Sequence, residues 1–129
     1  MTRILIDTHA FLWFTLNDSR LSRSATDCMA DPANELLFSP ASYWEIAIKI
    51  SIGRYSLPED FARFMQDQIA ENDLTILPVT VEHAAAVVKL PFHHRDPFDR
   101  LLAAQATVEG VELLSADEVF DHYIANRRW

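Results

Sequence analysis

Short apolar runs alternate along this chain with longer stretches in which apolar residues recur at helical spacing. The runs at 4–6, 36–39, 74–77 and 111–115 predict four strands, and the run at 36–39 is too apolar for a solvent-exposed face. The stretches between them predict helices over 8–16, 22–31, 40–52, 57–69, 80–88 and 97–106. Strands separated by helices favour right-handed crossovers. We therefore predict one α/β domain, residues 1–129, with three layers and a mostly parallel central sheet.

Five acidic residues stand where this arrangement would bring them together. Asp7 and Asp117 follow strands, Glu45 lies near the start of a helix that follows a strand, and Asp96 and Asp99 open the last long helix. Ligands of open parallel sheets bind outside the carboxyl ends of the strands. All five carboxylates can therefore lie at one edge of the sheet.

Each acid also has a local interpretation. Asp7 could cap the helix after it, although Thr8 could do so equally well. Glu45 could pair with Lys49 four residues later. Asp117 could cap a short helix over 118–122. Because apolar residues flank Glu45, however, a surface pair alone does not explain its position, and a buried carboxylate requires a charged partner.

The pair at 96 and 99 is the most ambiguous. Asp96 is a good N-cap, Pro97 suits the first helical position, and Asp99 falls where an acid can bond back to the cap in a capping box. Helix capping alone explains this pattern, without a catalytic or metal-binding role for either acid. Asp99 is nevertheless our candidate metal ligand, whereas Asp96 is expected mainly to cap the helix that presents Asp99, with metal contact as its second possible role.

Carboxylates that converge without a counter-ion repel one another and raise one another's pKa values. A hard divalent cation such as Mg²⁺ or Mn²⁺ resolves this, because it prefers oxygen ligands and retains waters. Such an ion can activate water for phosphodiester hydrolysis. The net charge of −8 argues against a broad basic surface for nucleic acid, so the metal would supply positive charge locally.

Composition excludes several other classes. The only glycines, Gly53 and Gly110, cannot build a P-loop or a dinucleotide-binding turn. The single cysteine, Cys28, cannot form an internal disulfide and is expected to be a small buried residue in a reducing cytosol. The apolar runs are too short to span a bilayer. We therefore expect a cytoplasmic protein without a membrane partner.

Histidine, aromatic and arginine residues offer weaker signals. His9, His93 and His94 could lie near the acids, but no familiar zinc spacing occurs, so His93 and His94 are expected to be loop residues or substrate contacts. Three aromatic residues could stack on bases, but core packing is favoured for them; they are Trp13, Trp44 and Phe98. Two arginines, Arg95 and Arg100, could either contact phosphates or be solvated surface residues.

Taken together, four motifs resemble those of PIN-domain ribonucleases, and specifically the VapC-type toxins of bacterial toxin–antitoxin pairs. The motifs are Leu-Ile-Asp-Thr-His at 5–9, Ser-Tyr-Trp-Glu-Ile-Ala-Ile-Lys at 42–49, His-His-Arg-Asp-Pro-Phe-Asp-Arg-Leu-Leu-Ala-Ala-Gln-Ala at 93–106, and Ser-Ala-Asp at 115–117. The resemblance covers essentially the whole chain.

The resemblance implies a sheet in the order 3-2-1-4-5, for which 123–126 is a weak fifth-strand candidate. It also implies an acidic Mg²⁺ or Mn²⁺ pocket for endonucleolytic RNA cleavage. Asp7, Glu45 and Asp99 match the core acids of the family. Asp117 matches a fourth acidic or amide position, and Ser115 a position that can hold a metal-bound water, with Thr8 in a supporting place.

The family further implies partners: an RNA substrate, a second copy in a homodimer, and a cognate VapB-type antitoxin that usually binds the operator DNA itself. The alternative that the residues leave open is a non-catalytic Mg²⁺-binding signalling module of the receiver type. Receiver domains carry a lysine at the end of a late strand. The only lysines of this chain, Lys49 and Lys89, do not follow a predicted strand. A dehalogenase-type phosphatase expects Asp-x-Asp, but His9 stands two residues after Asp7.

Overall fold

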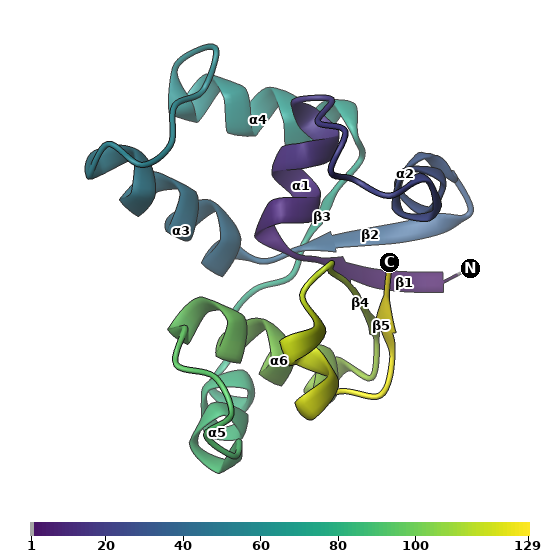
Figure 1. Ribbon diagram of the computed structural model, residues 1–129, viewed down its shortest axis with the longest axis vertical. Coiled ribbons are helices and arrows are strands. Elements are labelled where there is room, and N and C mark those ends of the chain that lie inside the picture. Colours follow the sequence, from purple (N-terminus) through teal and green to yellow (C-terminus); the bar gives the residue numbers. More distant parts are fainter. Residues whose placement is uncertain (1) are drawn as a thin grey trace.

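The computed structural model describes residues 2–129 and is built around a five-stranded, all-parallel sheet in the order β3-β2-β1-β4-β5 (Figure 1). The strands are β1 (Thr2–Ile6), β2 (Asn34–Phe38), β3 (Thr75–Ile76), β4 (Glu112–Leu114) and β5 (Arg127–Arg128). The predicted fold class and the strand order implied by the resemblance are both confirmed.

Six α-helices and one 3₁₀ helix connect the strands. They are α1 (Thr8–Thr15), α2 (Arg23–Ala30), α3 (Pro40–Ser51), α4 (Phe61–Glu71), α5 (Val81–Lys89), α6 (Pro97–Glu109) and η1 (Glu118–His122). Side-chain caps set most of the starts: Ser22, Ser39, Asp60, Thr80 and Asp96 each accept a hydrogen bond from a backbone N–H of the following helix. Within 2–129 no helix is both long enough and apolar enough to cross a membrane.

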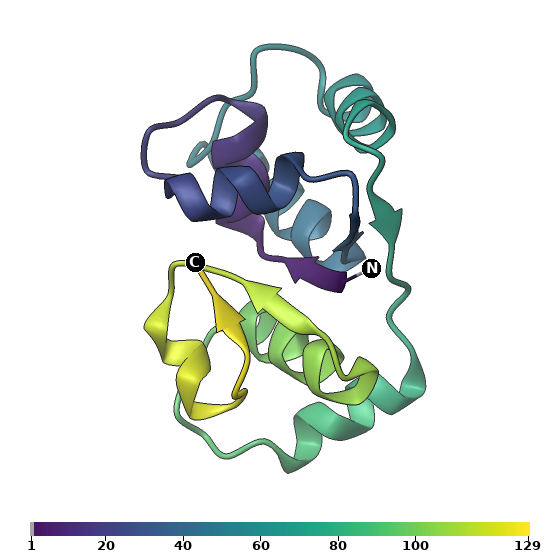
Figure 2. The same cartoon turned by 90° about the vertical axis from the view of Figure 1, so that its right-hand side faces the viewer.

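The two faces of the sheet carry separate cores because successive strand side chains point to opposite sides. Ile4 and Ile6 of β1 pack with the side chains of α1–α4, whereas Leu5 between them packs with α6 and the C-terminal segment. Figure 2 shows this division, with α1–α4 on one side of β1 and with α5, α6 and η1 on the other. The alternation therefore produces the three layers.

Strand β1 lies at the centre of the sheet, paired in parallel with β2 on one side and β4 on the other. The chain leaves β1 toward one face and returns to β4 from the other, which makes this the topological switch point where open α/β sheets bind ligands. The first residues beyond these three strands are Asp7, Ser39 and Ser115. The sheet thus places Asp7 in the middle of its carboxyl edge.

All five strands differ in their bounds from the sequence predictions, and the fifth differs most. The third spans only Thr75–Ile76 rather than 74–77, and the fifth forms at Arg127–Arg128 rather than at 123–126. Strand β5 has no apolar pattern. Instead, it is held by its ladder with β4 and by ion pairs of Arg127 with Asp121 and of Arg128 with Glu112. Hydrophobic periodicity could not reveal a strand stabilised in this way. Helix α4 also begins later than predicted, because Asp60 caps it.

Candidate active site

Asp7 combines a structural role with a position in the pocket. Its Oδ1 accepts a hydrogen bond from the backbone N–H of Ala10 at 2.7 Å, so Asp7 rather than Thr8 caps α1. Only 5% of the residue is exposed. Among the residues of 2–129, no lysine, arginine or histidine forms an ion pair with Asp7. The cap therefore satisfies one oxygen but leaves the negative charge without a cation.

Glu45 lies on α3, and its carboxylate is held by two neighbours, Thr8 and Lys49. The Thr8 hydroxyl donates to Oε1 at 2.7 Å and also lies 3.1 Å from the Ser42 hydroxyl. The Lys49 ammonium donates to Oε2 at 2.7 Å. The predicted pair of Glu45 and Lys49 thus exists, but it involves a carboxylate only 4% exposed rather than a surface acid. Thr8, which the sequence assigned a supporting place, fixes the orientation of this carboxylate.

Asp99 and Asp96 have different surroundings at the start of α6. Asp96 Oδ1 accepts from the backbone N–H groups of Phe98 at 2.9 Å and Asp99 at 3.1 Å, as the cap interpretation predicts. The Asp99 carboxylate contacts the ring of His94 instead of closing a capping box, with Asp99 Oδ2 and His94 Nε2 2.8 Å apart. Asp99 is thus available to the pocket, while one oxygen of Asp96 is engaged by the helix.

Asp117 comes from the C-terminal segment and faces this pair across the pocket. Its Oδ1 accepts from the backbone N–H of Val119 at 3.0 Å, so the predicted cap of η1 is present. The fully buried Ser115 hydroxyl accepts from the Asp117 backbone N–H at 3.0 Å. Unlike Asp7 and Glu45, Asp117 is exposed. Its carboxylate can therefore reorient toward a bound ion at little cost in packing.

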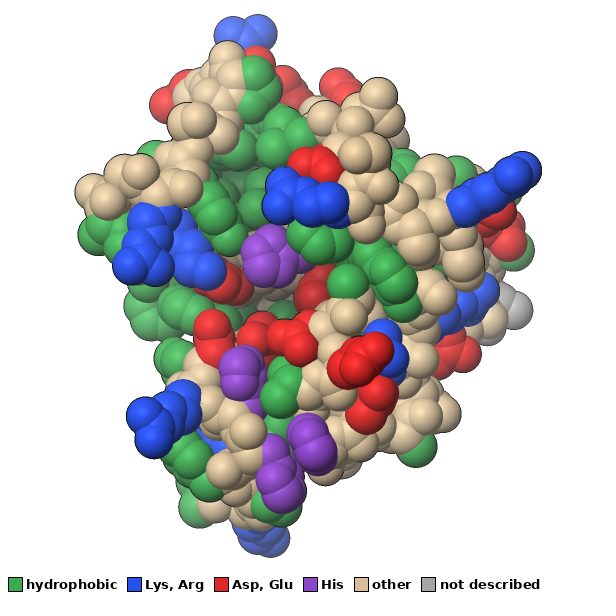
Figure 3. All heavy atoms as spheres, in the orientation of Figure 1, with side chains coloured by type: hydrophobic (Ala, Val, Ile, Leu, Met, Phe, Trp, Pro, Cys, Tyr) green, Lys and Arg blue, Asp and Glu red, His purple; other side chains and the backbone are tan. Residues whose placement is uncertain are grey.

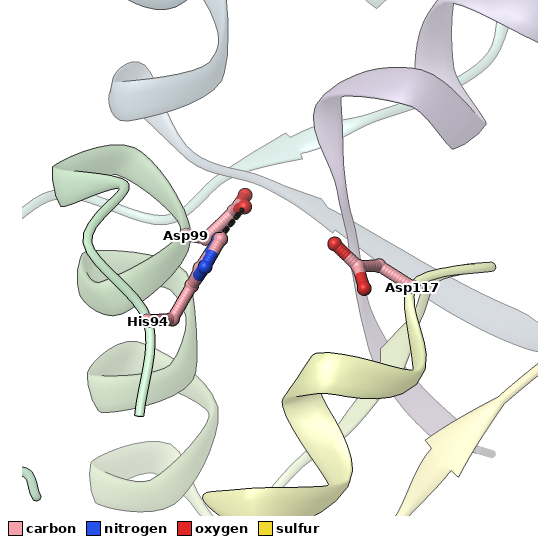
Figure 4. Close-up of side chains that lie close together, drawn as sticks. All are labelled: His94, Asp99 and Asp117. Atoms are coloured by element: carbon pink, nitrogen blue, oxygen red, sulfur yellow. Dashed lines mark hydrogen bonds and ion pairs between the residues drawn. The ribbon is translucent and has the colours of Figure 1, made fainter. Parts of the chain in front are cut away.

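One ligand atom from each of His94, Asp99 and Asp117 lies within 4.8 Å of the others. Figure 4 shows His94 and Asp99 pointing at each other, with Asp117 opposite them. Asp7, Glu45 and Asp96 lie outside this tight group but surround it electrostatically. In Figure 3 acidic side chains gather in a hollow in the middle of this face, bordered by histidines. Charge interactions couple Asp7 with Glu45 and Asp117, and Asp99 with Asp96 and Glu45, so the five predicted acids lie near one another. His94 was expected only as a residue that could lie near the acids; its contact with Asp99 was not predicted, because it joins the loop before α6 to the first turn of that helix.

The electrostatics of the site match a cation-binding pocket. Burial raises the pKa of Asp7 to about 6, an effect that hydrogen bonds from Ser115 and Ala10 oppose and the charges of Glu45 and Asp117 reinforce. Burial likewise raises the pKa of Asp99 to about 6, with the hydrogen bond from His94 opposing it. Ionisation of these two carboxyl groups is unfavourable, and further acids lie beside them. A bound cation would stabilise their ionised forms.

The donor set fits Mg²⁺ or Mn²⁺. Both ions prefer oxygen ligands, and Asp7, Asp99 and Asp117 offer carboxylate oxygens at the carboxyl edge of the sheet. Tetrahedral zinc prefers nitrogen and sulfur donors, and His94 is the only such donor within the group. The carboxylates therefore favour a hard cation.

Arg100 is not a solvated surface residue, one of the two possibilities considered from the sequence. It is 8% exposed, and its guanidinium donates to the backbone carbonyls of Val87, Leu90 and Pro91 at 3.1 to 3.4 Å. The same group lies 3.4 Å from the Tyr123 hydroxyl. Arg100 thus ties the end of α5 to the loop that carries His94.

We expect Arg100→Met to lower the free energy of unfolding by about 2–4 kcal/mol, because three carbonyls lose a charged donor. Chemical denaturation measures the change. Arg100→Lys should recover only part of the loss, since an ammonium cannot reproduce the planar fork. If Arg100→Met instead raised KM for RNA at unchanged stability, Arg100 would be a substrate contact after all.

The aromatic expectations are only partly correct. Trp44, expected in the core, is 61% exposed and meets the edge of Phe98 at 5.5 Å between ring centroids. Trp13 is half-buried against Trp129, at 5.8 Å. Cys28 is buried, as predicted. A helix that is apolar nearly all round, such as α3, does not reveal from its sequence which apolar side chain the fold leaves outside.

The fold and the site define an α/β protein with an acidic pocket at the switch point of a parallel sheet. The PIN-domain model matches residues 4–125, and the chain belongs to this family. It is 33% identical over 118 residues to Ribonuclease VapC22 of Mycobacterium tuberculosis, an alignment that covers 91% of this chain and 88% of the relative. The predicted resemblance to VapC-type PIN proteins is thereby confirmed.

Two solved structures share the fold at low sequence identity. One is VapBC2 of Rickettsia felis bound to a DNA fragment from its promoter, with a TM-score of 0.72, 12% identity and 98% of each chain covered. The other is VapBC-1 of nontypeable Haemophilus influenzae, with a TM-score of 0.68, 14% identity, and 98% of this chain and 97% of that chain covered. These similarities support the arrangement of strands and helices described above.

Proposed function

We propose that this protein is the toxin of a VapBC-type pair and acts as a Mg²⁺- or Mn²⁺-dependent endoribonuclease. The observation that carries the proposal is the buried Asp7, which has no ion-pair partner among residues 2–129 and lies at the centre of the acidic edge. Family membership and the similarity to a ribonuclease support RNA as the substrate. An acidic receiver-type module is not favoured by these comparisons.

In this proposal Asp7, Glu45, Asp99 and Asp117 are the catalytic acids, and these four with Asp96 are the candidate metal ligands. A bound Mg²⁺ or Mn²⁺ supplies an activated water and neutralises charge on the scissile phosphate. The chain's own part is to hold the carboxylates in place. Thr8 and Lys49 orient Glu45, the backbone of α1 orients Asp7, and Ser115 braces the turn that presents Asp117.

The proposed partners follow from the solved relatives, two of which are VapBC complexes. We propose that a VapB-type antitoxin binds this chain and that operator DNA is contacted only through that antitoxin, since this chain has a net charge of −8. A homodimer and a cytoplasmic site of action are part of the same proposal. Co-purification with the protein encoded beside it tests the antitoxin partner.

The direct test is cleavage of RNA by the purified protein. We expect cleavage of single-stranded or structured RNA in Mg²⁺ or Mn²⁺, loss of cleavage in EDTA, and recovery when the metal is restored. The ends of RNA from cells that express the chain identify the target. A protein that binds Mg²⁺ and cuts no RNA would instead support the signalling module.

The pKa values predict how stability depends on pH and metal. The folded carboxyl groups of Asp7 and Asp99 have pKa values near 6, above the ordinary 3.8, so the folded state holds their protons more tightly than the unfolded state. Their contribution to stability is therefore present below pH 4 and is lost as pH rises through about 6. Bound metal should offset this loss of stability only above about pH 6, where both carboxyl groups are ionised.

We accordingly expect 10 mM Mg²⁺ to raise Tm by roughly 2–5 °C at pH 7.5, if the Kd is about 1 mM, and by much less at pH 5.0. Differential scanning fluorimetry at matched ionic strength measures both shifts. Equal shifts at the two pH values would show that Mg²⁺ acts elsewhere than on these carboxylates.

A further inference from the structure

A second pocket opens beside the acidic one, between α1 and the segment that follows α3. Its volume is about 240 Å³, and its lining includes His9, Trp13, Arg20, Arg54 and Tyr55. His9 lies two residues after Asp7 on the first turn of α1. We call this cavity the His9 pocket. It therefore adjoins the candidate site through the backbone that carries the central acid.

The rings in the His9 pocket are held in fixed positions. The exposed imidazole of His9 stacks on Trp13 with 5.3 Å between ring centroids and 20° between planes. The Tyr55 hydroxyl is 3.3 Å from His9 Nε2, and the Lys49 ammonium lies over the Tyr55 ring at 5.3 Å. Since Lys49 also binds Glu45, a continuous chain of contacts connects Glu45 to this aromatic surface.

The cations of the pocket differ in how far they are neutralised. Arg20 is paired with Asp18, which it contacts at 2.8 and 3.1 Å, and its guanidinium lies over Trp13 at 4.9 Å. Lys49 is paired with Glu45. Arg54 is exposed and forms no ion pair with any residue in 2–129. In a chain of net charge −8, an arginine without an ion pair beside aromatic rings favours a ligand that carries both an anionic group and a planar ring.

We propose that the His9 pocket binds one nucleotide of single-stranded RNA next to the scissile phosphate, with its base against the rings of His9 and Tyr55 and its phosphate on Arg54. The inference rests on the proposed ribonuclease function and adds a substrate subsite to it. Aromatic platforms bind bases with little sequence preference, and a cation alongside tracks the backbone. The subsite provides this acidic protein with a contact to RNA that does not depend on a metal ion.

The pocket has room for one base but not for a duplex, so the strand must be unpaired at this position. A protein partner could also use aromatic and arginine side chains here. RNA is favoured because the pocket adjoins the candidate cleavage site and presents a cation, whereas the chain as a whole has a net charge of −8. The test below separates the two occupants.

Binding is measured in an Asp99→Asn background, which keeps the RNA intact, with a fluorescein-labelled pool of random ten-nucleotide RNA. We expect Arg54→Gln to weaken binding threefold to tenfold and to lower the slope of log affinity against log salt by about 0.7, the value for one phosphate contact to a single strand. We expect His9→Ala to weaken binding at least fivefold. His9→Phe should restore most of that loss, because it keeps the ring on Trp13.

Arg63→Gln is the matched control. Arg63 is an exposed arginine on α4 outside the pocket, and its substitution changes net charge by the same amount. We expect less than a twofold effect. Photo-crosslinking with 5-bromouridine RNA should also yield adducts on peptides that contain residues 9–13 or 54–57.

The outcomes distinguish the subsite from the ribonuclease activity. If the wild-type protein cleaves RNA while Arg54→Gln and His9→Ala bind like Arg63→Gln, the subsite is overturned and the nuclease stands. If these variants keep RNA affinity and lose binding of a co-expressed partner protein, the pocket belongs to that partner and the subsite is again overturned. A wild-type protein that cuts no RNA overturns the proposed function itself.

Discussion

Replacing Asp7 by asparagine is expected to reduce RNA cleavage by at least about a hundredfold while making the metal-free protein more stable. Asparagine keeps the cap on the Ala10 N–H, because its side-chain oxygen also accepts a hydrogen bond. It removes a buried negative charge whose pKa is raised to about 6. At pH 7.5 the free energy of unfolding should therefore rise by about 1–2 kcal/mol.

Asp7→Ala separates the two roles of this residue. Alanine also abolishes the charge but loses the cap, which costs about 1 kcal/mol, so its stability should fall below that of Asp7→Asn. Urea denaturation in EDTA, together with cleavage rates in Mg²⁺, gives both quantities. An Asp7→Asn protein that cleaves RNA at the wild-type rate would remove Asp7 from the catalytic set, and with it the central claim about the pocket.

The second large effect concerns the two acids at the start of α6. Asp99→Asn should reduce cleavage about as much as Asp7→Asn, because Asp99 faces Asp117 across the site and its carboxylate is not used by the helix. Asp96→Asn should change cleavage less than tenfold, since asparagine can accept the same bonds from the N–H groups of Phe98 and Asp99.

Asp96→Ala completes the comparison. It should lower the free energy of unfolding by about 1 kcal/mol through loss of the cap, with a modest effect on cleavage. If Asp96→Asn proved as inactive as Asp99→Asn at unchanged stability, Asp96 would be a metal ligand as well as a cap. Isothermal titration of Mn²⁺ into each variant measures metal affinity independently of activity.

The sequence predicted those features that depend on local chemistry. Short apolar runs at 4–6 and 36–39 placed two central strands, and capping residues such as Ser22 and Thr80 placed helix starts. The acids could be grouped because the edge of a parallel sheet collects whatever follows its strands. The resemblance then indicated which of them the family uses.

Features that depend on tertiary contacts could not be read in this way. Arg100 looks like an ordinary charged residue in the sequence, and only the fold shows that carbonyls of α5 and the following loop surround it. The contact of His94 with Asp99 and the ion pairs that support β5 arise from loop paths that no periodicity encodes. The exposure of Trp44 likewise depends on what α3 packs against.

The central position of β1 also affects when the pocket can exist. Asp7 leaves the ribosome long before the strand that completes its surroundings, because β4 ends at Leu114 and Asp117 follows later still. The halves of the sheet on either side of β1 are therefore joined only after β4 has been synthesised. A nascent chain therefore cannot assemble the full set of acids until Asp117 has emerged from the ribosome.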